Sequence, residues 1–154
     1  MDGNPFRVRT FEFGDKTKKT LVMFGPINGS ALLYVSIFSE LAERYRVIVV
    51  EHGSHGMNTR LAECSGNASH EAAEEWLADW TQKVFVRLDL PEKFYLLGIC
   101  FGCHLVCRYA STQPHRVEKL FLASPMVRPI DLDWDPYTYP VPSWRVGETK
   151  GKTN

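Results

Sequence analysis

The chain has 154 residues, which suits a single domain able to bury roughly two-thirds of its unfolded surface. Hydrophobic residues make up 44% and charged residues 23%, and eighteen basic residues balance eighteen acidic ones. This composition is globular and gives no reason to expect binding to nucleic acid. Because no stretch has the apolar length of a signal peptide or a membrane span, we expect a soluble, cytoplasmic protein.

The first half of the chain predicts three strands and one helix. Residues 6–13 alternate between two faces and are followed by Gly14-Asp15, which predicts a hairpin or an edge strand. Residues 20–24 and 46–50 are short continuous apolar runs, typical of strands buried on both faces of a sheet. Between them, residues 30–45 carry apolar side chains at helical spacing.

The second half continues the alternation. After a loop with Asn67 or Ser69 as the expected N-cap, apolar residues recur at helical spacing, which predicts a helix whose tryptophans belong to the core. A strand over 93–99, a helix over 101–112 and a strand over 117–124 follow. The apolar stripe of the first of these helices consists of Ala73, Trp76, Leu77, Trp80 and Val84.

This order of elements predicts the α/β class, with a parallel sheet and helices on both of its faces. We expect residues 1–125 to form the core. Residues 126–154 are rich in proline and show no periodic element, so they are expected to be the start of a cap over the sheet or a disordered tail.

The four cysteines predict no metal centre. Cys100, Cys103 and Cys107 fall at helical spacing and lack the paired cysteines and histidines of a zinc site. We expect Cys103 and Cys107 to act as small packing residues on one helix. No metal and no cofactor is predicted.

Residues 98–103 read GICFGC and stand between a predicted strand and a predicted helix. A nucleophile on such a sharp turn needs small residues two positions before and after it, a need that Gly98 and Gly102 meet. The helix that starts at Phe101 would point its N-terminal amides toward Cys100, which favours the thiolate. The pattern therefore makes Cys100 the candidate nucleophile.

With these motifs in place, residues from about 6 to 125 resemble the α/β-hydrolase fold, and in particular its lipid-acting branch of lysophospholipase- and acyltransferase-like proteins. The resemblance is carried by the GICFGC turn, by the segment CRYASTQPHRVEKLFLASP and by the loop after strand 20–24. It implies the N-terminal half of a three-layer sandwich and a small-molecule or lipid ester as substrate. Peripheral contact with lipid surfaces is then the alternative to a purely cytoplasmic protein.

The resemblance also assigns the oxyanion hole, with two departures from the family pattern. The family usually carries serine where this chain has Cys100, and its His-Gly pair aligns with Gly25-Pro26. Since proline has no N–H, one oxyanion donor maps to the amide of Ile27 and the other to that of Phe101. The acidic-Gly loop of the family aligns with residues 51–60, starting at Glu51.

The base of such a mechanism is harder to place. The family's histidine follows its last strands, whereas His115 lies beyond the far end of the 101–112 helix and His104 lies on that helix. His52 and His55, in the loop after strand 46–50, are the substitute bases that the chain offers, with a solvated loop as the alternative reading. Asp131, Asp133 and Asp135 are either the acid or a solvated turn.

Three hypotheses follow. The first is a thiol-based carboxylic ester or thioester hydrolase or acyltransferase, expected to be weak or inactive in a chain of this length. The second is a hydrolase-like binding or regulatory module in lipid metabolism that performs no catalysis. The third is a fragment that a partner completes, since a homodimer or another protein would have to cover an open edge at the strand over 117–124.

Overall fold

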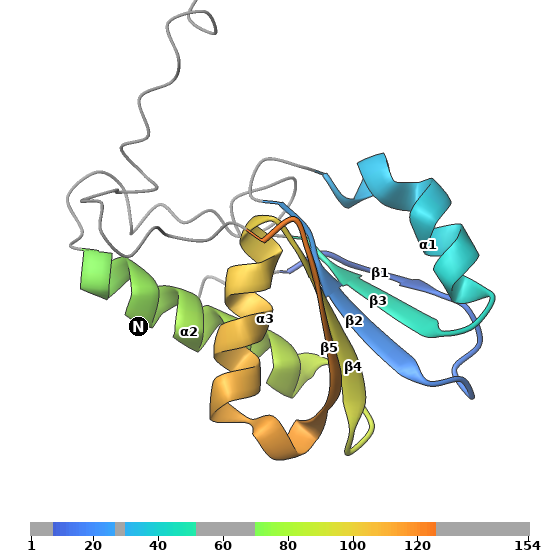
Figure 1. The fold of residues 1–154 in the computed structure, drawn as a ribbon. Coiled ribbons are helices and arrows are strands. Elements are labelled where there is room, and N and C mark those ends of the chain that lie inside the picture. The colour runs from blue at the N-terminus through green and yellow to red at the C-terminus, as the bar shows by residue number, and fades with distance from the viewer. Residues whose placement is uncertain (1–7, 27–29, 52–69, 126–154) are drawn as a thin grey trace, which may run out of the picture.

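The computed structural model describes residues 8–26, 30–51 and 70–125. These residues form a sheet with helices on both faces (Figure 1). The α/β class and the alternation of strands and helices are thereby confirmed. In chain order the elements are β1 (Thr10–Phe13), β2 (Thr20–Phe24), the 3-10 helix η1 (Ala31–Tyr34), α1 (Val35–Ala42), β3 (Arg46–Val50), α2 (His70–Arg87), β4 (Phe94–Ile99), α3 (Phe101–Thr112), the 3-10 helix η3 (Pro114–Arg116) and β5 (Val117–Ala123).

The strand order is β1-β3-β2-β4-β5. The strands β3, β2, β4 and β5 run parallel to one another, and β1 runs antiparallel to β3. Parallel neighbours need long crossover connections, which the segments containing α1, α2 and α3 supply. Every residue of β2 and of β3 is buried, as the two continuous apolar runs predict.

β1 is an edge strand, and the hairpin alternative is wrong. It pairs with β3, from Thr10 opposite Val50 to Phe13 opposite Val47, and not with β2, the next strand in the chain. Gly14 explains the route, because its φ is +82° and a Cβ there would lie 2.3 Å from the carbonyl oxygen of Tyr45. The chain therefore passes close to the turn between α1 and β3 before it enters β2, and only glycine fits that passage.

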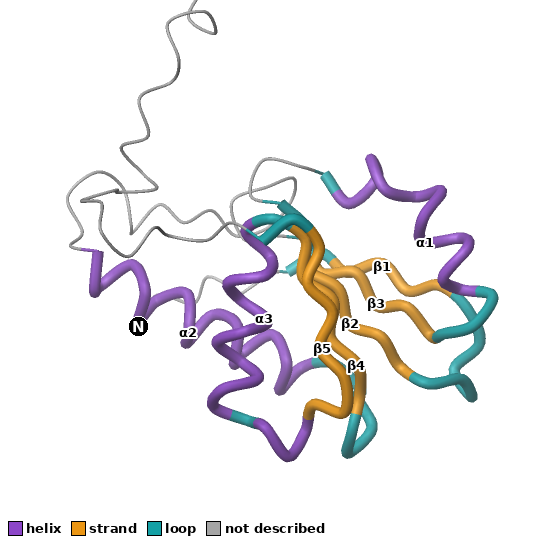
Figure 2. The backbone as a smooth tube through the Cα atoms, in the orientation of Figure 1, coloured by secondary structure: helices purple, strands orange, loops and turns teal. Residues whose placement is uncertain are grey.

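The helices divide the core into two layers (Figures 1 and 2). α1 packs over β1 and β3, while α2 and α3 cover the opposite face. The larger cluster lies under α2 and α3 and is rich in aromatic rings, with the centroids of Phe85 and Tyr109 3.8 Å apart. Trp80 is buried in this cluster and Trp76 packs against it, so both tryptophans belong to the core, as expected.

Helix α3 corrects one prediction about the cysteines. Cys103 is buried, as expected of a packing residue, but Cys107 is exposed. The buried face of α3 is centred on Leu105, Val106 and Tyr109. At about 100° per residue, Cys107 lies nearly opposite Tyr109 and faces solvent.

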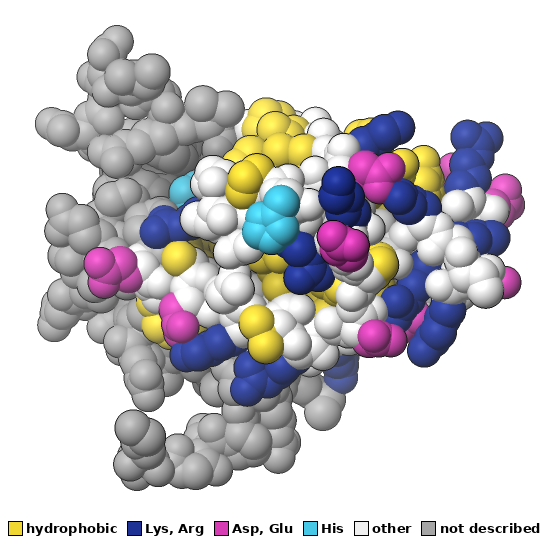
Figure 3. Space-filling model, turned by 90° about the horizontal axis from the view of Figure 1, so that it is seen from below, with side chains coloured by type: hydrophobic (Ala, Val, Ile, Leu, Met, Phe, Trp, Pro, Cys, Tyr) yellow, Lys and Arg dark blue, Asp and Glu magenta, His cyan; other side chains and the backbone are white. Residues whose placement is uncertain are grey.

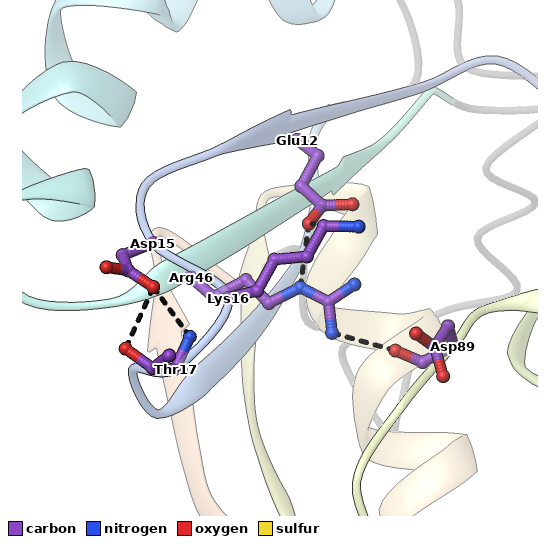
Figure 4. Close-up of polar contacts among 6 residues, drawn as sticks. All are labelled: Glu12, Asp15, Lys16, Thr17, Arg46 and Asp89. Carbon is purple, nitrogen blue, oxygen red and sulfur yellow. Dashed lines mark hydrogen bonds and ion pairs between the residues drawn. The ribbon is translucent and has the colours of Figure 1, made fainter.

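Arg46 connects three parts of the structure at the start of β3 (Figure 4). Its side chain is 7% exposed, and its Nε donates a hydrogen bond of 2.8 Å to Glu12 Oε1 on β1. A second bond of 2.9 Å runs from Nη1 to the carbonyl oxygen of Asp89, in the connection between α2 and β4. A buried guanidinium is tolerated because charged and polar acceptors meet it.

β5 differs from the other parallel strands in its exposure. Leu120, Phe121 and Leu122 are 39%, 41% and 46% exposed, although parallel strands are usually covered on both faces. Within residues 8–26, 30–51 and 70–125, β5 pairs with β4 and no strand pairs with its outer edge. The open edge expected at this strand stays a prediction, because residues 126–154 lie outside the described part of the chain.

The end of the sheet where the parallel strands begin is mixed in charge. Figure 3 views the molecule from this side and shows basic and acidic side chains interspersed among apolar ones. This view shows no large patch of a single sign, in keeping with the balanced composition.

The Glu12–Arg46 contact predicts a pH-dependent contribution to stability. The hydrogen bond from Arg46 lowers the pKa of Glu12, so its stabilisation is present above the ordinary glutamate pKa and is lost as the pH falls through the lowered folded-state pKa. Glu12→Gln should reduce the free energy of unfolding at pH 7 by about 1 kcal/mol, because the Glu12 side chain is 36% exposed and partly screened.

Urea denaturation between pH 7 and 3 measures this effect. The difference between variant and parent should shrink once the pH falls below about 4. Glu40→Gln, at an exposed position on α1, is the matched control and should change little. A Glu12→Gln deficit of equal size at every pH would contradict the electrostatic account.

Candidate active site

Cys100 lies in the turn between β4 and α3, at the end of the sheet where the parallel strands finish. Its backbone has φ 54° and ψ −116°. Among the described residues, Cys100 and Ser124 are the two non-glycine residues with positive φ. Such a conformation costs on the order of 1–3 kcal/mol and persists only where the surroundings enforce it.

Two glycines allow the turn to pack this tightly. A Cβ on Gly98 would lie 2.5 Å from the Cα of Cys103, directly under the turn. A Cβ on Gly102 would lie 2.0 Å from the carbonyl oxygen of Phe24. The first turn of α3 therefore rests against the backbone at the end of β2, with no room for any side chain.

Hydrogen bonds fix the turn from both sides. The Cys100 N–H donates to the carbonyl oxygen of Ala123 on β5 at 3.0 Å, and the Cys103 N–H donates to the Cys100 carbonyl at 3.1 Å. The Cys103 thiol donates to the Gly98 carbonyl at 3.0 Å. These bonds join β4, β5 and α3 at the point where the strain is held.

The cysteines of α3 and its preceding turn differ in what they can do. Cys103 is buried, and desolvation raises the pKa of its thiol, which keeps it protonated and inert. Cys100 is half-buried, at the N-terminus of α3, and so can be reached by a small reagent. Of these two cysteines, Cys100 is the more accessible.

The two expected oxyanion donors differ in what the structure says of them. Phe101 is the first residue of α3, where backbone N–H groups point out of the helix end beside Cys100. Ile27 lies outside the described residues. The residues before it are placed, because a Cβ on Gly102 would also lie 2.9 Å from the carbonyl oxygen of Gly25. The loop that leads to Ile27 thus starts against the first turn of α3.

Neither histidine proposed as a base lies in the described part of the chain. His52 and His55 fall outside it, as do Asp131, Asp133 and Asp135. His104 stacks on the ring of Phe101 at a centroid distance of 5.9 Å. His115 is in η3, which follows α3, at the opposite end of the helix from Cys100.

Sequence reasoning missed a polar contact on the other side of this loop. Ser30 Oγ donates to Glu51 Oε1 at 3.1 Å, and Glu51 is 3% exposed. A serine directly before an apolar helical run is an N-cap signal, and Ser30 does cap η1. Its link to Glu51 joins segments far apart in the sequence, which no local pattern reports.

The described residues contain no group of three or more His, Cys, Asp or Glu side chains placed to hold a metal ion. None of the helices found there has the length and apolarity needed to span a bilayer.

The family of the chain follows from comparison with known sequences. A model of the alpha/beta hydrolase fold matches residues 19–149. The chain belongs to the α/β-hydrolase family. The strand order and the turn at Cys100 are therefore those of an α/β-hydrolase, and the resemblance seen in the sequence is confirmed.

Individual relatives agree with this assignment. A protein of Oryza sativa subsp. japonica named "Probable 1-acylglycerol-3-phosphate O-acyltransferase" is 31% identical over 117 residues, which are 75% of this chain and 27% of that protein. A membrane phospholipase A described as a bacterial virulence factor has a similar structure, with a TM-score of 0.65 and 20% identity, covering 81% of this chain and 38% of its own. A hydrolase from Pseudomonas aeruginosa PA01 gives 0.63 and 21%, with 77% and 42% covered.

The chain spans less than half the length of each of these three proteins. What it shares with them is the part of the α/β-hydrolase fold that contains the strand-to-helix turn. The fold is thus a partial α/β-hydrolase fold, as predicted.

The contact between Gly102 and β2 predicts a large effect of a single methyl group. Gly102→Ala should lower the free energy of unfolding by about 3 kcal/mol, because the strand backbone would have to move away from α3. Gly25→Ala is the matched control, since a Cβ there would meet nothing within 4 Å. Chemical denaturation of both variants tests this, and equal stability of the two would show that α3 does not rest on β2 as described.

Proposed function

We propose that the protein is an acyl-ester or lipid hydrolase, or an acyl-transfer protein, that uses the thiol of Cys100 as its nucleophile. The observation that carries this proposal is the strained backbone of Cys100 at the N-terminus of α3. Strain of this kind is kept where a side chain has to be presented to a ligand. The half-buried thiol stands at the strand ends, where ligands of α/β sheets bind.

In the proposed step, the Cys100 thiolate attacks the carbonyl carbon of an ester and forms a C–S bond. The negative charge that develops on the carbonyl oxygen would be met by the amides of Phe101 and Ile27. The ester C–O bond then breaks, and the leaving alkoxide takes a proton from water or from His52 or His55. Attack by water or by an alcohol on the thioester would complete hydrolysis or acyl transfer.

A lipid ester is the substrate class that the relatives favour. The rice protein is named as an acyltransferase for an acylglycerol phosphate, and one structural neighbour is a phospholipase. We extend this to the present chain as a proposal, because it spans only part of each relative. A small activated ester reports the same acylation chemistry without requiring the correct lipid.

A second candidate function is a binding or regulatory module that performs no turnover. It is favoured because neither of the two described histidines lies where it could act as a base for Cys100. His104 stacks on Phe101, and His115 is at the far end of α3. Without a base, proton transfer loses a factor of typically 10²–10⁴. We therefore expect weak or single-turnover chemistry from this chain.

Acylation of the full 154-residue chain by a nitrophenyl ester tests the thiol mechanism. We expect release of one equivalent of nitrophenol with little steady-state turnover, and a thioester adduct on Cys100 in mass spectrometry. Cys100→Ala should abolish the adduct, whereas Cys107→Ala, an exposed cysteine on the same helix, should not. If His52 or His55 is the base, its alanine variant should slow acylation at least about tenfold, equivalent to ~1.4 kcal/mol.

Two results would count against this mechanism. Sustained turnover that persists in Cys100→Ala would exclude the thiol as nucleophile. Absence of any acyl adduct on the parent chain would favour the binding module.

We further propose that the open edge of β5 pairs with a second copy of the chain. The Ala123 carbonyl points toward β4, where it accepts from Cys100. Because backbone groups alternate along a strand, the N–H and C=O groups of Leu120 and Leu122 point outward. Their side chains are apolar and exposed, so this edge offers both backbone partners and apolar surface.

The pattern of β5 is compatible with pairing to itself. In an antiparallel, two-fold arrangement with Leu120 on the axis, Leu120 faces its symmetry copy and Lys119 faces Phe121. No like charges are opposed in this register. An isologous dimer would thus cover the exposed apolar residues of both copies.

Light scattering on the purified chain decides this proposal. We expect a dimer in the parent, and a shift to monomer in Leu120→Lys, because position 120 faces its own copy across the two-fold axis and two like charges would then be opposed. Val86→Lys is the control, since Val86 is 73% exposed on α2 and lies outside the proposed contact. A parent that is monomeric at high micromolar concentration, or a variant that dimerises equally well, would overturn the pairing.

A further inference from the structure

We infer that Cys100 and Cys103 form a dithiol pair that exchanges with disulfides and closes into a reversible disulfide within the chain. The two cysteines read C-x-x-C, the first immediately before α3 and the second in the first turn of that helix. This spacing at the start of a helix, within a βαβ unit, is typical of thiol–disulfide exchange sites. The inference goes beyond the proposed function, because disulfide exchange requires neither an oxyanion donor nor a histidine.

The two cysteines occupy positions at the start of a helix whose side chains lie close together. Cys100 is the N-cap residue of α3, and Cys103 is the third residue of the helix. In a capping box, the side chains at these same two positions reach toward each other across the first turn. The thiol of Cys100 makes no capping hydrogen bond to that turn, so rotation about its Cα–Cβ bond breaks none.

The backbone of the turn has the span that a disulfide needs. The Cys103 N–H donates to the Cys100 carbonyl oxygen at 3.1 Å, which closes a turn of four residues. The Cα atoms at the two ends of such a turn lie within about 7 Å of each other. Disulfides join Cα atoms that are about 4.4–6.8 Å apart, so this pair is at a suitable separation.

Both cysteines also bond to one carbonyl group at the end of β5. The oxygen of Ala123 accepts from the Cys100 N–H at 3.0 Å and from the Cys103 thiol at 3.5 Å. The same thiol donates to the Gly98 carbonyl oxygen on β4 at 3.0 Å. The sulfur of Cys103 is therefore held where β4, β5 and the turn at Cys100 come together.

Burial gives the two thiols different roles in the exchange. Cys100 is half-buried and can meet a small disulfide from solution, whereas Cys103 is buried. Desolvation raises the pKa of the Cys103 thiol, so this thiol reacts poorly with reagents in solution. A mixed disulfide on Cys100 would place a sulfur atom beside it, and the high effective concentration offsets the small thiolate fraction. Cys100 is thus the attacking thiol and Cys103 the resolving thiol.

The exchange consists of two balanced steps, with a low-molecular-weight disulfide such as glutathione disulfide as the oxidant. The Cys100 thiolate attacks one sulfur of the oxidant and forms an S–S bond, and one glutathione leaves as a thiolate. Cys103 then loses its proton to solvent and attacks the Cys100 sulfur, and the second glutathione leaves. The protein loses two electrons and two protons, and the oxidant is reduced to two molecules of glutathione.

Closure of the disulfide would also remove the nucleophile of the proposed acyl chemistry. The oxidised pair has no thiol at Cys100, and Cys103 has no proton to donate to the Gly98 carbonyl. A small dithiol reductant reverses both changes. The redox state of the pair then decides whether the turn presents a nucleophile.

Incubation of the full 154-residue chain with glutathione disulfide tests the pair. The experiment uses the variant Cys107→Ser, because Cys107 shares the tryptic peptide 94–108 with both cysteines and would confuse the assignment. The remaining thiols are blocked with N-ethylmaleimide before digestion. We expect this peptide to be two hydrogens lighter than its reduced form, with neither glutathione nor maleimide attached. Cys64 lies on a different tryptic peptide and does not interfere.

Two further variants in the same background separate the steps. Cys103→Ser should stop at the mixed disulfide and keep one glutathione on Cys100. Cys100→Ser should leave Cys103 without glutathione, because Cys103 is buried. Cooperative unfolding in urea checks that both variants fold.

Three results would overturn the pair. The first is glutathione that stays on Cys100 in Cys107→Ser throughout the incubation, and the second is a chain in which neither cysteine reacts. The third is loss of glutathione from Cys103→Ser as fast as from the chain that retains Cys103. Because Cys107 is exposed, peptide mapping of Cys107→Ser leaves the core intact and decides the outcome even if Cys103→Ser does not fold.

Discussion

The contact of Gly102 with the end of β2 is the constraint on which the rest of the site depends. Because the first turn of α3 rests directly on the Phe24 carbonyl, the helix must start within one residue of the end of β4. Cys100 is left as the only residue to make the turn, and its backbone takes up the strain. The two neighbouring glycines follow from the same lack of space. A close approach between two backbones thus determines which side chain is presented.

Most of the sheet could be predicted from local pattern, because burial on both faces produces uninterrupted apolar runs. The bounds of β2 and β3 agree with the sequence for this reason, and those of α3 agree because its apolar residues recur at helical spacing and Pro114 follows its end. The partner of β1 could not be predicted, since it depends on the passage of Gly14 beside Tyr45, a contact between distant segments. The prediction that Cys107 is a packing residue is wrong, because helical spacing to Cys103 does not indicate which face of the helix meets the sheet.

The site was predictable only in part, and for related reasons. The GICFGC turn is contiguous, so its glycines and thiol can be recognised together. The Ser30–Glu51 bond joins two loops that meet only once β2 and β3 are paired. The two edges of the sheet also differ from each other, although the composition of the chain as a whole is balanced in charge. β1 closes one edge with a charged pair at Arg46, whereas β5 leaves apolar side chains exposed at the other.

The bond from the Cys100 N–H to the Ala123 carbonyl has a consequence for how the molecule is made. β2 and β3 can pair early during synthesis, since a short helical connection joins them. β4 must then be inserted beside β2 across a long crossover, which slows folding. The turn at Cys100 receives its last support from β5, the final strand described. The turn at Cys100 can therefore complete its hydrogen bonds only after Ala123 has been synthesised, and a nascent chain that stops before Ala123 lacks the acceptor for the Cys100 N–H.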